Sequence, residues 1–125
     1  KRRATRLMTN DEFNEFCGGL KGTTHVVQWG NSDVWKVGGK LFAVAGWNGG
    51  EPAYTFKVKP LVFEVLGDEA GIRPAPYLAS RGMKWLQWYD DGALSKAELK
   101  RHIELSYQMI FDALPKKKQA EILKG

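Results

Sequence analysis

The sequence predicts a single α+β domain, with helices packed on one face of a five-stranded, mainly antiparallel sheet. Residues 25–59 hold four short runs rich in β-branched and aromatic residues, joined by glycine-rich turns. These turns are too short for the crossovers that parallel strands require. Segments with helical spacing flank the strand block, as is typical of a two-layer domain. The 125 residues are enough for one hydrophobic core but not for two.

The first predicted helix begins at a capping box, Thr9-Asn10-Asp11-Glu12. In this motif the threonine hydroxyl accepts from a free helix amide and the glutamate bonds back to the cap. Apolar residues then follow at positions i, i+3, i+4 and i+7, which gives the helix one buried side: Phe13, Phe16, Cys17 and Leu20. The pair Gly18-Gly19 is expected to end it.

Strands are predicted over residues 25–29, 34–37, 40–47, 53–59 and 83–89. Gly38-Gly39 joins the second and third as a tight hairpin, because both glycines tolerate the positive φ values of such a turn. The fourth strand alternates in polarity, with Tyr54, Phe56 and Val58 expected to be dry and Thr55, Lys57 and Lys59 expected to be wet.

Two further helices and one extended segment complete the predicted fold. Pro60 suits the first turn of a short helix, and the prolines of residues 72–77 keep that segment extended. A second capping box, Ser95-Lys96-Ala97-Glu98, opens the longest helix, which Pro115 ends or kinks. Its buried side is predicted to comprise Leu99, Ile103, Ser106, Tyr107, Ile110 and Leu114. A short helix over residues 116–123 is expected to follow.

Most of the net charge of +5 comes from the N-terminus. Lys1, Arg2, Arg3 and Arg6 leave 15 basic against 14 acidic residues in the rest of the chain, a net charge of +1. We therefore divide the chain into a basic tail, residues 1–8, which could be an addition to the natural protein, and a folded domain, residues 9–125. A single cysteine excludes an internal disulfide, and cytoplasmic location is expected.

The sequence shows no pattern typical of a catalytic or metal site. Cys17 lies on the apolar side of a helix, where cysteine usually behaves as a small hydrophobe. The two histidines, His25 and His102, are far apart, and no cluster has metal-ligand spacing. Asp90-Asp91 precedes a glycine and is better explained as a solvated turn than as paired catalytic carboxylates. We expect no enzyme activity and no cofactor.

Taken in order, these segments resemble the MmcQ/YjbR family of small bacterial proteins, which have a CyaY-like, double-wing α/β fold. The resemblance is carried by the capped first helix, the Val34–Ala43 hairpin with its Lys-Val-Gly-Gly-Lys core, and the strand Phe56-Lys57-Val58-Lys59. The segment Gly71–Leu78 and the ending Leu114-Pro115-Lys116-Lys117 complete it. DNA binding has been suggested for this family, so the resemblance implies a non-catalytic DNA-binding protein with no catalytic residues to transfer.

Five tryptophans and the strand lysines indicate where DNA would bind. Trp85 and Trp88 are three positions apart, so in a regular strand they point to opposite faces and at least one should face away from the core. An exposed aromatic among lysines suits base stacking with phosphate neutralisation. The candidate nucleic-acid-binding residues are Lys36, Lys40, Lys57, Lys59, Arg73, Arg81, Lys84, Trp85 and Trp88.

A protein-interaction adaptor or chaperone-like module is the alternative interpretation. Leu61-Val62-Phe63 is wholly apolar where family members usually have a more acidic helix start, and it could seat a protein partner. No apolar run approaches the ~20 residues that cross a bilayer, so no membrane contact is expected. A monomer is favoured, and DNA or a protein is the expected partner.

Overall fold

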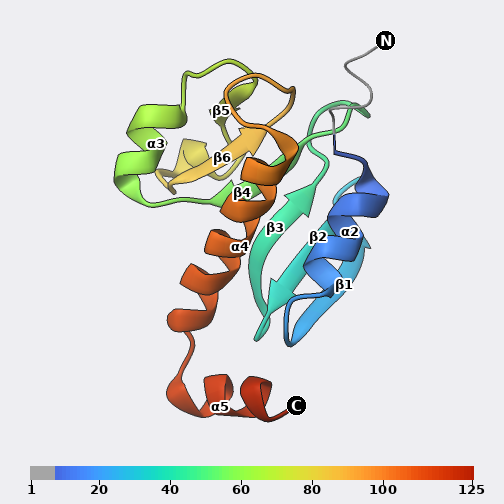
Figure 1. The fold of residues 1–125 in the computed structure, drawn as a ribbon, viewed down its shortest axis with the longest axis vertical. Coiled ribbons are helices and arrows are strands. Elements are labelled where there is room, and N and C mark those ends of the chain that lie inside the picture. Colours follow the sequence, from blue (N-terminus) through green and yellow to red (C-terminus); the bar gives the residue numbers. More distant parts are fainter. Residues whose placement is uncertain (1–7) are drawn as a thin grey trace.

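Six antiparallel strands form one sheet in the computed structural model, which describes residues 8–125 (Figure 1). The spatial order of the strands is β1-β2-β3-β4-β6-β5, and every neighbouring pair is antiparallel. The strands are β1 (Thr23–Gln28), β2 (Ser32–Val37), β3 (Lys40–Ala45), β4 (Tyr54–Lys57), β5 (Ile72–Pro74) and β6 (Trp85–Trp88). The α+β class and the antiparallel sheet are thus confirmed.

The predicted number of strands was one too low. The additional strand is β5, which was expected to be extended but not paired; Ile72 lies opposite Trp88 and Pro74 opposite Leu86. A proline is tolerated there because β5 is an edge strand, where a missing backbone donor costs no ladder hydrogen bond.

The helices α2 (Asn10–Gly18) and α4 (Lys96–Asp112) lie across one face of the sheet (Figure 1). Both predicted capping boxes are confirmed: the hydroxyls of Thr9 and Ser95 accept from the amides of Glu12 and Glu98, whose carboxylates accept from the cap amides in return. The shorter helices are α3 (Pro60–Leu66) and α5 (Lys116–Lys124), with a 3₁₀ turn, η1, at Ala79–Arg81. None of the helices in residues 8–125 has the length and hydropathy to cross a membrane.

The core lies between the helices and the facing side of the sheet. Phe13 of α2 stacks on Tyr54 with ring centroids 4.9 Å apart, and Phe56 stacks on His102 of α4 at 5.7 Å. Met8 also belongs to this core: its side chain is buried and its carbonyl accepts from the Tyr54 hydroxyl at 2.8 Å. Met8, which was assigned to the tail from the sequence, therefore packs with the domain.

The expected wet side of β4 is dry at Thr55, which is fully buried. The face of the sheet opposite the helices is also covered there, because the segment after β3 runs across it. The side-chain amide of Gln87, which lies opposite Thr55 in the ladder, donates to the carbonyl oxygens of Gly46 and Trp47 in that segment. Strand alternation alone predicted a solvated face because it does not record loops that fold back over a sheet.

The predicted β2–β3 hairpin is present. Gly38 and Gly39 have φ values of 59° and 81°, the left-handed pair that a two-residue turn between twisted strands favours. The ladder shifts register after Trp35, so that Lys36 lies opposite Leu41 while Trp35 lies opposite Ala43. Lys36 and Leu41 therefore share the face opposite the helices.

Candidate functional site

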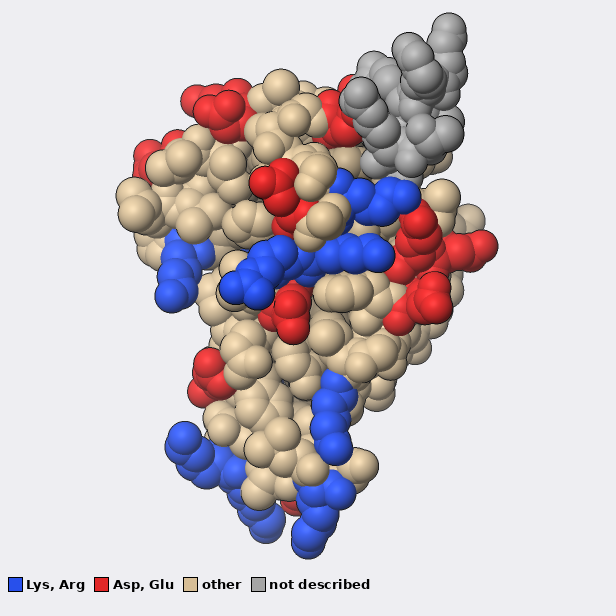
Figure 2. Space-filling view, viewed as in Figure 1, with Lys and Arg blue, Asp and Glu red and all other residues tan. Residues whose placement is uncertain are grey.

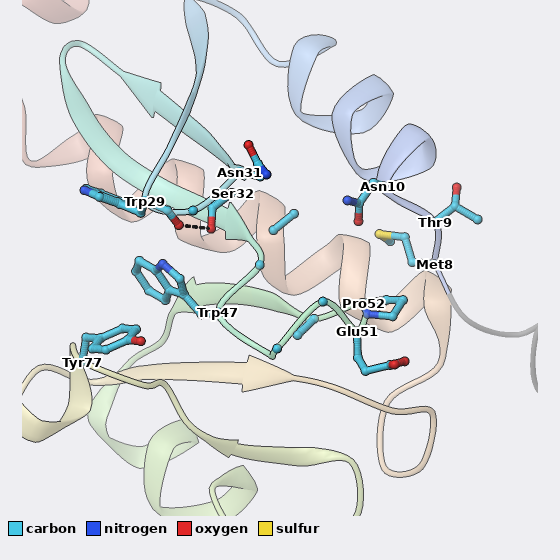
Figure 3. Close-up of a pocket in the computed structure, with 16 residues that line it drawn as sticks. Met8, Thr9, Asn10, Trp29, Asn31, Ser32, Trp47, Glu51, Pro52 and Tyr77 are labelled. Atoms are coloured by element: carbon cyan, nitrogen blue, oxygen red, sulfur yellow. Dashed lines mark hydrogen bonds between the residues drawn. The ribbon is translucent and has the colours of Figure 1, made fainter.

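Three aromatic side chains from three separate turns meet on the sheet face opposite α2 and α4. They are Trp29, after β1, Trp47, after β3, and Tyr77, after β5, and Figure 3 shows them in a row. Ring centroids are 5.6 Å apart between Trp29 and Trp47 and 5.3 Å apart between Trp47 and Tyr77. Trp29 is 51% exposed and Tyr77 is 65% exposed. We call these three residues the aromatic platform.

Each platform residue has a left-handed backbone. The φ values are 54° for Trp29, 63° for Trp47 and 70° for Tyr77; only Asn31 joins them among the non-glycine residues of 8–125. For a bulky side chain this conformation is strained and costs about 1–2 kcal/mol per residue relative to the right-handed region. Such strain persists only where surrounding contacts enforce it, and it concentrates at functional sites.

Side-chain hydrogen bonds hold all three strained peptides in place. The carbonyl oxygen of Trp29 accepts from the Ser32 hydroxyl at 3.0 Å, and that of Tyr77 accepts from the Ser80 hydroxyl at 2.7 Å. The carbonyl oxygen of Trp47 accepts from the side-chain amide of Gln87 at 3.2 Å. The platform is therefore fixed by the fold before any ligand arrives, which lowers the entropic cost of binding.

A second layer of hydrogen bonds orients Gln87. Its side-chain oxygen accepts from Nε of Arg73 at 2.7 Å, and the guanidinium of Arg73 also donates to Oδ1 of Asn48 at 2.9 Å. The guanidinium lies 4.9 Å from the ring centre of Tyr89. Arg73, one of the candidate nucleic-acid-binding residues, is thus engaged in positioning the turn that carries Trp47.

The platform separates two hollows in the surface. One is a cleft of about 750 Å³ that runs from the platform to Met8 and the start of α2, and it includes Glu51 and the glycines of the turn after Trp47 (Figure 3). The other, of about 520 Å³, is bounded by the platform with Leu41, Leu78 and Arg81. All three platform residues line both hollows, so a ligand in either hollow can contact the platform.

The charges beside the platform differ between the two hollows. Arg81 is exposed and lines the smaller one, and Lys36 lies on the same sheet face, opposite the lining residue Leu41. Glu51 is exposed and lines the larger cleft. The basic side of the platform is thus the side of Arg81 and Lys36.

The other predicted lysines lie elsewhere. Lys40 is exposed at the β2–β3 turn. Lys57 and Lys59 line a groove between α3 and α4 together with Val62, His102 and Met109. The ammonium of Lys84 lies 4.9 Å from the ring centre of Phe63 on α3. The nine candidate residues consequently form no single surface.

Trp85 and Trp88 are both buried, with exposed fractions of 3% and 0%. They do point to opposite faces, as the odd offset predicted, since Trp88 lies opposite the core residue Tyr54 and Trp85 opposite Lys57. The expectation that one of them is solvent-exposed was wrong, because covering segments bury the second face as well. The exposed tryptophan and tyrosine side chains among residues 8–125 are instead Trp29, Tyr77 and Tyr89, and the first two lie beside half-buried Trp47.

The platform was not predicted because the exposed aromatic residues were expected in strands rather than in turns. The available signal was their position in turns: Trp29 precedes Gly30-Asn31, Trp47 precedes Asn48-Gly49-Gly50, and Tyr77 follows Pro76. A large aromatic inside a turn cluster has few neighbours that can bury it. That these three turns meet is shown by the ring contacts alone, and no local pattern in the sequence records it.

The residues considered for catalysis lie apart from the platform. Cys17 is fully buried in the core, and burial raises the pKa of its thiol well above the ordinary value. His102 stacks on Phe56, and burial lowers the pKa of its imidazole. Asp90 accepts from the amide of Asp91 in the expected turn. Residues 8–125 contain no group of three or more His, Cys, Asp or Glu side chains arranged to hold a metal ion.

The acidic and basic side chains of the opposite, helix-bearing face are mixed. Figure 2 shows acidic residues gathered over α2, and basic ones both over the first half of α4 and at the α5 end of the molecule. The α5 group comprises Lys116, Lys117, Lys118 and Lys124, with Glu121 among them. Among residues 8–125, the helix-bearing face thus has basic groups over α4 and at α5 but no row of exposed aromatic side chains like the platform.

Together these features define a small two-layer α+β protein with a preformed aromatic surface on the sheet face opposite its main helices. The family model for YjbR matches residues 18–109, most of the chain. The protein belongs to the YjbR family, as the ordered motifs indicated. No protein in the curated set matches it.

Two solved structures share the fold. Protein DR2400 of Deinococcus radiodurans, which carries the DUF419 domain, is 21% identical, with a TM-score of 0.78 over 91% of this chain and 87% of that one. A protein from Pseudomonas syringae is 22% identical, with a TM-score of 0.64 over 82% of this chain and 99% of that one. At these identities the likeness establishes the fold alone.

Proposed function

We propose that this protein binds DNA through the aromatic platform, without catalysing a reaction. The observation that carries the proposal is the row Trp29, Trp47 and Tyr77, held in strained conformations with two rings largely exposed. Because strained residues concentrate at functional sites, we infer that the ring faces contact a ligand. Base stacking is such a use, since every nucleobase offers a π-face.

Charge supports the same surface. Arg81 and Lys36 can neutralise phosphates on one side of the platform, where the guanidinium can also contact a base face. Figure 2 shows basic side chains on the helix-bearing face, over α4 and at α5, and the lysine run at the start of α5 is a rival location for phosphate binding. A purely electrostatic site at α5 would neutralise phosphates without stacking, so the two locations predict different sensitive residues.

The proposal is tested by fluorescence anisotropy of a labelled DNA strand, titrated at about 50 mM and about 200 mM salt. Trp29→Ala and Tyr77→Ala are each expected to weaken binding by about fivefold or more, the lower end of the effect of one lost stacking contact. Leu123→Ala is the matched control, since Leu123 is 61% exposed on α5, and it should bind like the unchanged protein.

Two further variants locate the binding. One replaces the four basic residues of the segment 1–7 by glutamine, and the other replaces Lys116, Lys117 and Lys118 by glutamine. Affinity that survives both changes but falls with the platform variants supports the proposal. Absence of binding at low salt, or loss of affinity only when the segment 1–7 or α5 is neutralised, would refute it.

A protein partner is the second candidate, favoured by a separate apolar surface. Leu61 and Val65 of α3 are 73% and 59% exposed, and the adjoining groove against α4 is lined by Val62, Leu105 and Met109. Phe63 and Val62 are partly covered, so only part of the expected Leu61-Val62-Phe63 patch is free. Leu61→Glu should abolish capture of a protein partner from nuclease-treated extract and leave DNA binding unchanged.

A further inference from the structure

We infer that the DNA recognised by the platform is unpaired, that is, a single strand or a single-stranded region. This inference rests on the proposed function and names the form of its ligand. Three observations support it: the exposed ring faces, the secondary-structure elements beside the platform, and the charged residues around it.

A base can stack on a platform ring only if its own flat face is free. In a duplex each base face is covered by the next base pair, and protein side chains reach only base edges in the grooves. The tilt between the rings of Trp29 and Trp47 is 38°, and Tyr77 meets Trp47 edge-on at 83°. Rings at such different angles cannot all stack on a straight column of bases, but they suit bases that are splayed out of one strand.

The elements beside the platform are poor readers of a DNA groove. The major groove admits an α-helix or a two-stranded ribbon, but helices α2 and α4 lie on the other face of the sheet (Figure 1). The hairpin of β1 and β2 does end at Trp29, but its only lysine or arginine is Lys36. A ribbon with one such cation gains little from the phosphates that line a groove.

The charges indicate on which side of the platform the sugar–phosphate chain of the DNA lies. Glu51 lines the larger cleft, so phosphates are disfavoured there, whereas Arg81 lines the smaller hollow and Lys36 lies on the same face. The sugar–phosphate chain is therefore assigned to the Arg81 side, with bases turned toward the platform rings. Two phosphate contacts on a single strand correspond to a log–log salt slope of only about −1.4.

Three polar side chains hold the backbone of the platform in place. Ser32, Ser80 and Gln87 donate to the three carbonyl oxygens. Ser80 is exposed and Ser32 lines the larger cleft, whereas Gln87 is fully buried and lines neither hollow. Gln87 is therefore a positioning residue: Gln87→Met keeps the volume but frees the Trp47 peptide. It is expected to weaken single-strand binding and leave the salt slope unchanged, whereas Arg81→Gln should lower the slope itself.

The test compares four labelled DNAs of the same length on the full chain: a single strand, the same sequence as a duplex, that duplex with an internal unpaired gap, and a strand lacking its bases at the central positions. We expect the single strand to bind about tenfold or more tighter than the duplex, with the gap restoring affinity. The strand without bases should bind about as weakly as the duplex, because it keeps its phosphates but has nothing to stack.

The possible results distinguish DNA binding itself from the preference for unpaired DNA. A duplex bound as tightly as the single strand, or a base-free strand bound as well as an intact one, would overturn the inference while the proposed function stands. Binding of none of the four DNAs would overturn both. Glu51→Gln provides an independent check of direction: it should change single-strand affinity less than about twofold, whereas Arg81→Gln should reduce it by about threefold or more.

Discussion

Thr55 and Gln87 lie directly opposite each other on β4 and β6 and are both fully buried, but in the part of the chain that the structure describes only Gln87 has hydrogen-bond partners for its side chain. Gln87 makes hydrogen bonds to Arg73, Gly46 and Trp47. The hydroxyl of Thr55 has no hydrogen-bond partner among residues 8–125. Of the two side chains, it is therefore Gln87 that anchors the turn carrying Trp47 to the sheet.

Thr55→Val is expected to raise the free energy of unfolding by about 1 kcal/mol, because it replaces an unpaired buried hydroxyl by a methyl group of similar size. Urea denaturation monitored by far-UV circular dichroism measures the change. A loss of stability would show that the hydroxyl has a partner in solution.

Gln87→Met is expected to lower the free energy of unfolding by about 1–3 kcal/mol, since it leaves the partly buried carbonyl oxygens of Gly46 and Trp47 without their donor. The same denaturation experiment measures it, with Thr55→Val as the matched control on the opposite strand. Equal stability of the Gln87 variant and the unchanged protein would contradict the positioning role.

Tyr77→Asn separates stability from binding. Asparagine tolerates the left-handed backbone, so relief of about 1 kcal/mol of strain offsets the lost edge contact with Trp47, worth about 0.5–1.5 kcal/mol. Unfolding free energy should stay within about 1 kcal/mol of the original, while DNA affinity falls as for Tyr77→Ala. A large loss of stability would mean that Tyr77 serves the fold rather than a ligand.

His102 gives stability a pH dependence in the mildly acidic range. Burial against Phe56 is the main cause that lowers the pKa of its imidazole below 6.5, with Glu98 opposing the shift and Arg101 assisting it. The unfolded chain therefore binds a proton more readily than the folded one, and stability falls as pH drops from about 6.5 toward the folded pKa. His102→Gln should remove this part of the pH dependence in denaturation curves measured between pH 7 and 5.

A second loss of stability is expected at lower pH from the capping glutamates. Hydrogen bonds with the cap residues Thr9 and Ser95 are the main cause that lowers the pKa of Glu12 and Glu98 below 4.5. Their contribution is complete above the unfolded pKa and disappears as pH falls through the folded values. In His102→Gln, the decline should therefore begin only below about pH 4.5; an unchanged decline near pH 6 would contradict the assignment to His102.

Local sequence signals predicted much of the fold. Thr9 with Glu12 and Ser95 with Glu98 placed the starts of α2 and α4 because capping boxes are complete within four residues. Gly38-Gly39 placed the hairpin for the same reason. On the buried side of α4 five of the six expected residues are buried; Ile110 is partly exposed and Phe111 takes its place.

The candidate site could not be predicted in the same way. Burial of Trp85 and exposure of Trp29 depend on which loop covers which face of the sheet, and no local pattern records this. The strand β5 was missed because it has only three residues, pairs with β6 alone and contains a proline, so it shows no clear alternation. The platform itself depends on three turns that are distant in sequence meeting at one place.

The most direct test of the central claim is intrinsic tryptophan fluorescence during titration with an unlabelled single DNA strand. Trp29 and Trp47 should be quenched by stacking, whereas Trp85 and Trp88 are buried and should not respond. We expect saturable quenching in the original protein that disappears in a Trp29→Phe, Trp47→Phe double variant, while anisotropy still reports binding. DNA binding by the original protein without any quenching would contradict the claim that bases stack on the platform.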